Sequence, residues 1–147
     1  MTRLTRRYRF CASHRLFSKT LDEERNRKVF GKCANPFGHG HNYFLEVTVA
    51  GEPDPRSGMV LPRSAFDAWV KTSVLDRVDH THLNSDLPEF EDLVPTAENI
   101  LVVVDAWLRE RWAERFPSEP LRLAGLRLEE TPRNSVQLPP SGHLSQQ

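Results

Sequence analysis

The chain has 147 residues, which suits one hydrophobic core, and 38% of them are hydrophobic while 27% are charged. This composition argues against a disordered protein, and the equality of 20 basic and 20 acidic residues argues against binding nucleic acid or membranes through net charge. No apolar run approaches the roughly 20 residues of a membrane helix. The two cysteines are too few for a disulfide framework, so we expect free thiols and a cytoplasmic location.

The first third of the chain carries two segments with the alternation of β-strands. In residues 4–14, aromatic and small apolar side chains alternate with polar ones, and residues 41–50 alternate in the same way. Residues 15–38 between them are expected to form a long loop, which is uncommon in a compact domain outside functional sites. Residues 51–58, GEPDPRSG, predict a turn.

Two helices are expected next, followed by two more strands. The first helix begins near Pro62, a residue that the first helical turn tolerates. Its apolar residues at helical spacing are Phe66, Trp69, Val70 and Val74. The second helix follows the N-cap candidate Thr96 and has Glu98 in its first turn. Its apolar stripe consists of Ile100, Val103, Val104, Trp107, Leu108 and Trp112. Residues 121–130 and 134–138 predict the remaining strands.

This order of elements predicts an α+β fold, in which a four-stranded antiparallel sheet carries both helices on one face. The other face of the sheet would be bare, and a bare sheet invites assembly, so we expect an oligomer. Residues 1–137 are expected to form a single domain, with 138–147 as a flexible polar tail.

The most distinctive motif is Gly38-His39-Gly40-His41 at the start of the second predicted strand. Residues two apart in a strand point to the same side, so His39 and His41 present their imidazoles together. If the first two strands pair antiparallel, His14 at the end of the first lies beside His41 at the start of the second. Three histidines with an open fourth position are typical of catalytic zinc rather than of a structural site.

Cys33 lies in the long loop, six residues before His39, and Lys32 beside it would stabilise a thiolate. The alternative is a small buried thiol, and Cys11, within the first strand, fits that alternative better. The spacing alone leaves the role of Cys33 open.

A second group of polar residues follows the first helix. Asp79 and His80 are adjacent, and their side chains cannot easily bond each other, so we expect both to reach Cys33 or substrate from one turn. The alternative is a plain polar loop. His82 competes with His80 as the partner of Asp79. Glu130 ends the third predicted strand, where a carboxylate can clamp the two N–H donors of an aminopyrimidinone ring. Its neighbour Glu129 faces the other side of the sheet.

Together these residues resemble the 6-pyruvoyltetrahydropterin synthase family. The matching segments are FCASHRL (10–16), FGKCANPFGHGHNY (30–43), SGMV (57–60), VDHTHLN (78–84), PTAEN (95–99) and LEETPRN (128–134). The resemblance implies a tunnelling fold, in which three four-stranded sheets with their helices close into a β-barrel and two such trimers stack into a homohexamer.

The resemblance also implies roles for individual residues. The zinc ligands would be His14, His39 and His41. The catalytic residues that move protons would be Cys33, Asp79 and His80. The residues of the pterin pocket would be Glu130, Thr96 and Glu98, with help from a neighbouring subunit.

The reaction implied by the resemblance converts 7,8-dihydroneopterin triphosphate to 6-pyruvoyl-tetrahydropterin with loss of triphosphate, a carbon–oxygen lyase reaction. Magnesium could accompany the triphosphate, for which Arg15, Lys19 and Lys28 are unranked candidate ligands. The alternatives are a 6-carboxytetrahydropterin synthase of the queuosine pathway, an aldolase acting on dihydroneopterin forms, and a non-catalytic zinc- and pterin-binding oligomer. The cysteine stands six residues before the first histidine of the HGH motif, which favours the pyruvoyl type.

Overall fold

The structure of the protein, a computed structural model, describes residues 1–117 and 121–139. The flexible tail was expected over residues 138–147. Of these, only residues 138 and 139 lie in the described part of the chain. Among the described residues, no helix is both long and apolar enough to cross a membrane.

Two long strands form the centre of the sheet. β1 (Thr2–His14) and β2 (His39–Gly51) pair antiparallel over their whole length, from Thr2 opposite Gly51 to His14 opposite His39. β4 (Arg122–Thr131) pairs antiparallel with β2, and β5 (Asn134–Leu138) pairs antiparallel with β4. All four predicted strands are therefore present, with the first two extended by one or two residues at their ends.

The sheet nevertheless has five strands in the order β3-β1-β2-β4-β5, and it is mixed rather than purely antiparallel. β3 (Thr81–His82) lies parallel to β1 beside Ala12 and Ser13. The expectation of four antiparallel strands was wrong on this point. A strand of two residues is too short to show the alternation on which such a prediction depends.

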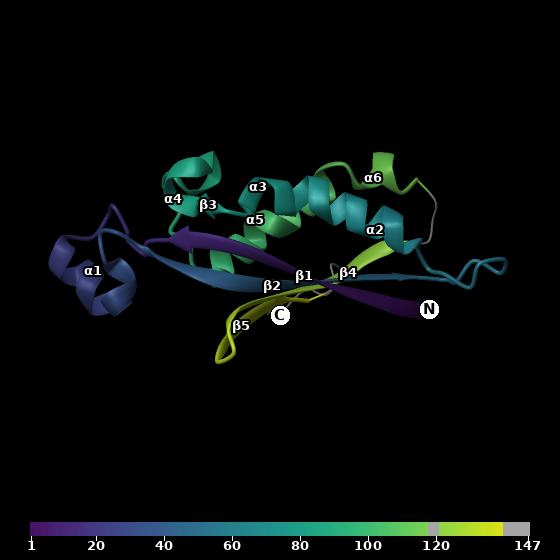
Figure 1. Ribbon diagram of the computed structural model, residues 1–147, viewed down its shortest axis with the longest axis horizontal. Coiled ribbons are helices and arrows are strands. Elements are labelled where there is room, and N and C mark those ends of the chain that lie inside the picture. Colours follow the sequence, from purple (N-terminus) through teal and green to yellow (C-terminus); the bar gives the residue numbers. More distant parts are fainter. Residues whose placement is uncertain (118–120, 140–147) are drawn as a thin grey trace, which may run out of the picture.

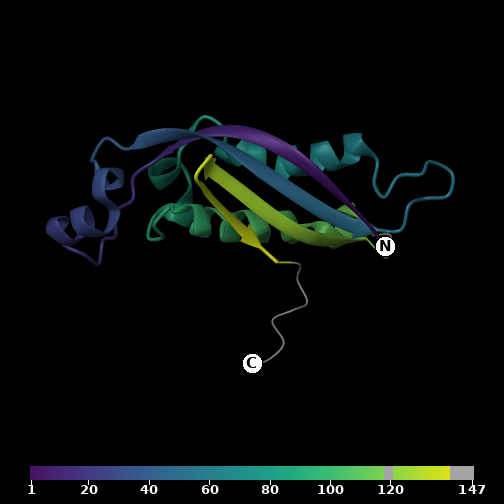
Figure 2. The ribbon, with the colours of Figure 1, turned by 90° about the horizontal axis from the view of Figure 1, so that it is seen from below.

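Both predicted helices pack on one face of the sheet, as Figures 1 and 2 show. The first is α2 (Arg63–Val70), continued by a π turn (Lys71–Leu75) and by α3 (Asp76–Val78). The second is α5 (Ala97–Glu110), which begins after the predicted cap Thr96. Three short segments complete this layer: α4 (Leu83–Asp86), a 3-10 turn (Pro88–Phe90) and α6 (Trp112–Arg115).

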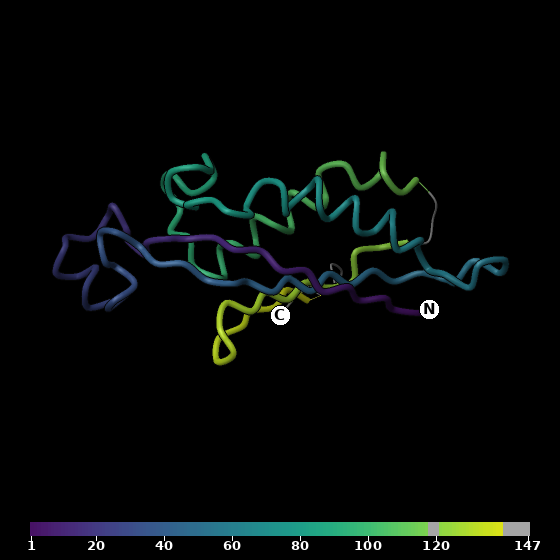
Figure 3. Tube along the Cα trace, viewed as in Figure 1, coloured from purple at the N-terminus to yellow at the C-terminus, as the bar shows by residue number. Residues whose placement is uncertain are grey.

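The connection between β1 and β2 is not the plain loop that was expected. It contains α1 (Glu23–Phe30) and a 3-10 turn, η1 (Gly31–Ala34), and it projects beyond the end of the sheet (Figure 3). The helix α1 is almost entirely polar, so it has no apolar stripe to reveal it. Hydrogen bonds hold it instead: Asp22 caps its first turn, and the buried Asn26 amide donates to three carbonyls.

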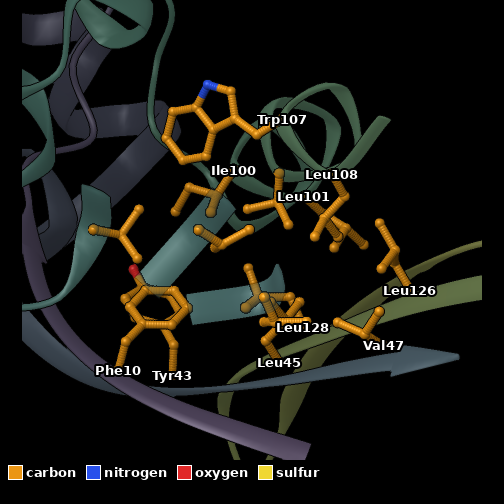
Figure 4. Packing of buried hydrophobic residues seen from close by; sticks show 14 of the residues in the cluster. Phe10, Tyr43, Leu45, Val47, Ile100, Leu101, Trp107, Leu108, Leu126 and Leu128 are labelled. Atoms are coloured by element: carbon orange, nitrogen blue, oxygen red, sulfur yellow. The ribbon is translucent and has the colours of Figure 1, made fainter. Parts of the chain in front are cut away.

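The core lies between the helices and the sheet. In Figure 4, α5 presents Ile100, Leu101 and Leu108 toward side chains from β2 and β4. Val103 of the predicted stripe is only partly buried, whereas Leu101 is fully buried, because α5 lies with a slightly different face toward the sheet. On the opposite face of the sheet no described helix packs (Figure 2).

Candidate functional site

The antiparallel pairing of β1 and β2 brings three histidines together at one end of the sheet. His14 lies opposite His39, and His41 follows two residues later on the same face. The direct partner of His14 is thus His39 rather than the expected His41, because the register is offset by two residues. The ligand nitrogens of the three imidazoles all lie within 4.8 Å of one another.

His14 is held as a neutral imidazole whose Nε2 lies beside His39. Its Nδ1 lies 2.8 Å from the carbonyl oxygen of Pro95, to which it donates, so its Nε2 carries the lone pair. This Nε2 is 3.0 Å from Nε2 of His39. Burial lowers the pKa of His14 to about 4, although the Pro95 carbonyl opposes the shift. Burial also lowers the pKa of His39, so both rings are uncharged near neutral pH and can bind a cation.

The third histidine leaves a buried nitrogen without a hydrogen bond. Nε2 of His41 is inaccessible to solvent and accepts or donates no hydrogen bond within residues 1–117 and 121–139. A buried polar atom without a partner is unfavourable by about 1–3 kcal/mol and calls for an explanation. A metal ion shared with the other two histidines supplies one, so the three residues form a candidate metal site.

Glu130 borders this site from β4. Its side chain is 12% exposed, and its Oε1 lies 3.5 Å from Nε2 of His41. Burial raises the pKa of Glu130; His41 opposes the shift and Glu98 of α5 adds to it. Glu129 points to the other face and pairs with Arg7 at 2.7 Å. The alternation of β4 therefore gives the site only one of the two glutamates, as predicted.

Cys33 lies in η1 beside the histidine end of the sheet. Its carbonyl accepts a hydrogen bond of 2.8 Å from the amide of Leu16, and its side chain is partly exposed. Burial raises the pKa of Tyr43, and the negative charges of Glu130 and Cys33 add to that shift. The hydroxyl of Tyr43 itself lies 3.3 Å from Nδ1 of His14.

The other cysteine differs from expectation. Cys11 is exposed on the bare face of the sheet, so its prediction as a buried thiol was wrong. The inward positions of β1 on either side of it are Phe10 and Ala12, and alternation directs Cys11 outward.

Asp79 and His80 lie at the edge of the sheet, next to Cys11. Asp79 Oδ1 accepts from the Cys11 amide at 2.9 Å, which is the main reason that its pKa is lowered, and it lies 3.0 Å from Nδ1 of His80. Adjacent side chains do therefore bond here, contrary to expectation, in a turn where the backbone of His80 is left-handed at φ 60°. His82 pairs instead with Ser13 Oγ at 2.8 Å.

The Asp79–His80 pair does not complete the site within one chain. In the part of the chain that the structure describes, no hydrogen bond or ion pair joins either residue to Cys33 or to the three histidines, and the His80 side chain is 82% exposed. The expectation was that both reach Cys33 or substrate from one turn; inside the protomer neither bonds to Cys33, and their approach to substrate stays a prediction.

Thr96 and Glu98 lie at the start of α5. The hydroxyl of Thr96 accepts from the amide of Asn99 at 3.3 Å, so it caps the helix as predicted. The cap fixes the start of α5, and the residue before it, Pro95, accepts the hydrogen bond from His14 through its carbonyl. Sequence reasoning missed Pro95 and Tyr43 as supports of the metal site; the position of Tyr43, two residues after His41 on the same face of β2, was the available signal.

Comparison with known proteins agrees with this architecture. The family model described as 6-pyruvoyl tetrahydropterin synthase matches residues 3–140. The 6-pyruvoyl tetrahydrobiopterin synthase of Homo sapiens is 48% identical over 101 residues, covering 69% of this chain and 70% of the relative. That of Drosophila melanogaster is 40% identical over 90% of this chain and 76% of the relative.

Two further matches extend the comparison. The solved 6-pyruvoyl tetrahydropterin synthase of Caenorhabditis elegans superposes with a TM-score of 0.85 at 35% identity, covering 95% of this chain and 96% of that one. A 6-carboxy-5,6,7,8-tetrahydropterin synthase of Rickettsia conorii is 29% identical over 94% of this chain and all of the relative. By sequence and by structure, this chain belongs to the 6-pyruvoyl tetrahydropterin synthase family.

Proposed function

We propose that this enzyme is a zinc-dependent 6-pyruvoyltetrahydropterin synthase, which converts 7,8-dihydroneopterin triphosphate to 6-pyruvoyl-tetrahydropterin and triphosphate. The observation that carries this proposal is the cluster of three histidines, in which the buried Nε2 of His41 has no hydrogen bond among the described residues and lies 3.5 Å from the Glu130 carboxylate. The names of the relatives at 40–48% identity support the pyruvoyl type.

His14, His39 and His41 would hold the zinc. Three imidazoles with an open fourth position suit this ion, and the hydrogen bond to Pro95 orients His14 for it. When bound, zinc would supply Lewis acidity toward the oxygens of the substrate side chain, so that a neighbouring C–H becomes more acidic. Magnesium would accompany the triphosphate rather than the histidines, because it prefers oxygen ligands.

Glu130 would orient the substrate. Its carboxylate faces into the site from β4, and its two oxygens match the paired N–H donors of the pterin ring. Thr96 and Glu98, at the start of α5, would border the same pocket. Cys33, in η1, would remove and return a proton on the substrate side chain.

Asp79 and His80 would complete the proton relay across a subunit contact. His80 is exposed at the edge of the sheet, and Asp79 fixes its ring through Nδ1. A neighbouring protomer that packs at this edge would bring its own Cys33 within reach of His80. Mixing inactive Cys33→Ala protein with inactive His80→Ala protein should therefore restore activity, because some contacts then combine an intact cysteine with an intact histidine.

We further propose that the single domain of residues 1–137 assembles through both edges of its sheet. β1 pairs with β3 only at Ala12 and Ser13, and β5 is the other edge of the described sheet. Pairing these edges between protomers would close three sheets into a β-barrel and remove the exposed strand edges. Two such trimers would form the homohexamer.

The test is product analysis of the zinc-loaded protein supplied with 7,8-dihydroneopterin triphosphate. We expect 6-pyruvoyl-tetrahydropterin and triphosphate by mass spectrometry, and loss of activity in Cys33→Ala and His39→Ala. Cys11→Ala is the matched control, because this second thiol lies on the bare face of the sheet. The appearance of 6-carboxytetrahydropterin and acetaldehyde would replace the proposed product, and an untouched substrate would refute the reaction.

A further inference from the structure

The side chain of Asn84 extends the pairing at the edge of β1 beyond the last residue of β3. β3 lies beside Ala12 and Ser13 and ends at His82, after which the chain turns into α4. From α4, Oδ1 of Asn84 accepts from the backbone amide of Arg15 at 2.8 Å, and Nδ2 donates to the Arg15 carbonyl at 2.9 Å. A side-chain amide has one donor group and one acceptor, as a peptide group has, so Asn84 takes the place of a strand residue here.

The same stretch of backbone holds the turn that carries Cys33. The amide of Leu16 donates to the Cys33 carbonyl at 2.8 Å, and the Arg15 side chain donates through Nε to the Ala34 carbonyl at 2.9 Å. The helix α1, which precedes η1, is almost entirely polar and has no apolar stripe that could anchor the insertion on the sheet. The position of η1 is therefore set through the residues that directly follow β1.

We propose that Asn84 is a positioning residue for the reaction, which fixes the place of Cys33 relative to the zinc ligand His14. His14, Arg15 and Leu16 are consecutive, so a clamp on the middle residue sets how η1 lies against the metal ligand. The inference rests on the proposed role of Cys33 in proton transfer. Such a transfer requires the thiol within hydrogen-bond reach of the proton that it removes, and a displacement of about 1 Å can lower the rate by about a hundredfold.

The test compares variants of Asn84 with a control outside the site. Asn84→Ala removes both hydrogen bonds, whereas Asn84→Asp keeps an acceptor for the Arg15 amide and loses the donor for its carbonyl. Thr72→Ala is the matched control, because it removes a side-chain hydrogen bond of 2.9 Å to the Ala68 carbonyl in the helix layer. For each protein we would measure kcat and KM with 7,8-dihydroneopterin triphosphate, the zinc affinity and urea unfolding.

We expect Asn84→Ala to lower kcat by about tenfold to a hundredfold, while KM and zinc affinity change by less than about threefold. The zinc affinity is retained because β2 and the Pro95 carbonyl still hold His14. Asn84→Asp should retain more of kcat than Asn84→Ala, and Thr72→Ala should not lower kcat. An unchanged kcat in Asn84→Ala overturns the proposal. A parallel loss of kcat, substrate binding and zinc affinity also overturns it, because Asn84 would then be a general support of the site.

A second measurement does not depend on the reaction. The chain has two cysteines, so in Cys11→Ala protein the rate of alkylation by iodoacetamide reports on Cys33 alone. In this background Asn84→Ala should raise that rate by about threefold or more, because η1 loosens, whereas Thr72→Ala should not. An alkylation rate unaffected by Asn84→Ala overturns the proposal. If the rate responds to Asn84 but wild-type protein forms no product, the placement of Cys33 by Asn84 is supported and only the proposed reaction fails.

Discussion

Replacing Gly38 by alanine should damage the metal site far more than the same change at another glycine of similar conformation. Gly38 has φ 68°, and a Cβ there would lie 2.8 Å from the His14 carbonyl oxygen and 3.1 Å from Cε1 of His82. The left-handed backbone costs an alanine about 1 kcal/mol, and the contact with backbone adds about 1–3 kcal/mol. We therefore expect a loss of about 2–4 kcal/mol in the free energy of unfolding.

Gly58→Ala is the matched control. Gly58 has φ 71°, yet a Cβ there would meet no atom within 4 Å, so its loss should be only about 1 kcal/mol. Urea unfolding of both variants measures the difference, and zinc titration measures the site. Because the Gly38 variant must displace the backbone of His14, its zinc affinity should fall by about tenfold or more while Gly58→Ala binds normally. Equal stability and equal zinc affinity in the two variants would refute the reasoning.

Three further predictions concern the core, the helix cap and the buried histidine. Leu108→Ala removes a side chain with no exposed surface and should cost about 2–5 kcal/mol in urea unfolding; a smaller loss would mean that the cavity collapses. Thr96→Ala should cost about 1 kcal/mol through loss of the cap, whereas Thr96→Ser should retain stability. For metal-free protein, lowering the pH from 7.5 to 5 should reduce the free energy of unfolding by about 2 kcal/mol on account of His14. The pKa of His14 is about 4 in the folded protein and 6.5 in the unfolded chain, so the unfolded chain binds more protons in this range of pH. His14→Asn should remove that part of the slope; equal slopes in both proteins would contradict it.

The convergence of the histidines could be predicted because it depends only on local rules. Alternation places His39 and His41 on one side of β2, and antiparallel pairing of neighbouring strands brings the end of β1 to the start of β2. An error of two residues in register changed which histidine faces His14 but not which three meet. The α5 cap was equally predictable, since Thr96 precedes a run of apolar residues at helical spacing.

The remaining features depend on contacts that no local pattern records. α1 is polar except for Val29 and Phe30 at its end, and the Asn26 side chain stabilises the segment that leads into the helix by donating to the carbonyls of Ser18 and Leu21. β3 has only two residues and forms because the chain after α3 meets the edge of β1, where the His80 amide bonds to the Cys11 carbonyl at 2.6 Å. A prediction from periodicity has nothing to detect in either place.

The positions of the site residues explain why catalysis would require two protomers. The three histidines and Glu130 face the helices from three strands, and Cys33 comes from the insertion that projects beyond the sheet. The Asp79–His80 pair is also ordered by hydrogen bonds, yet its imidazole faces outward at the sheet edge. An exposed histidine with its ring orientation fixed by a carboxylate contributes nothing to the core of its own protomer. The fixed orientation of the His80 ring can serve only a group outside its own protomer, and in the proposed barrel that group is Cys33 of the next protomer. Proton transfer would then require assembly, so dilution to monomers should abolish turnover while each chain still binds zinc.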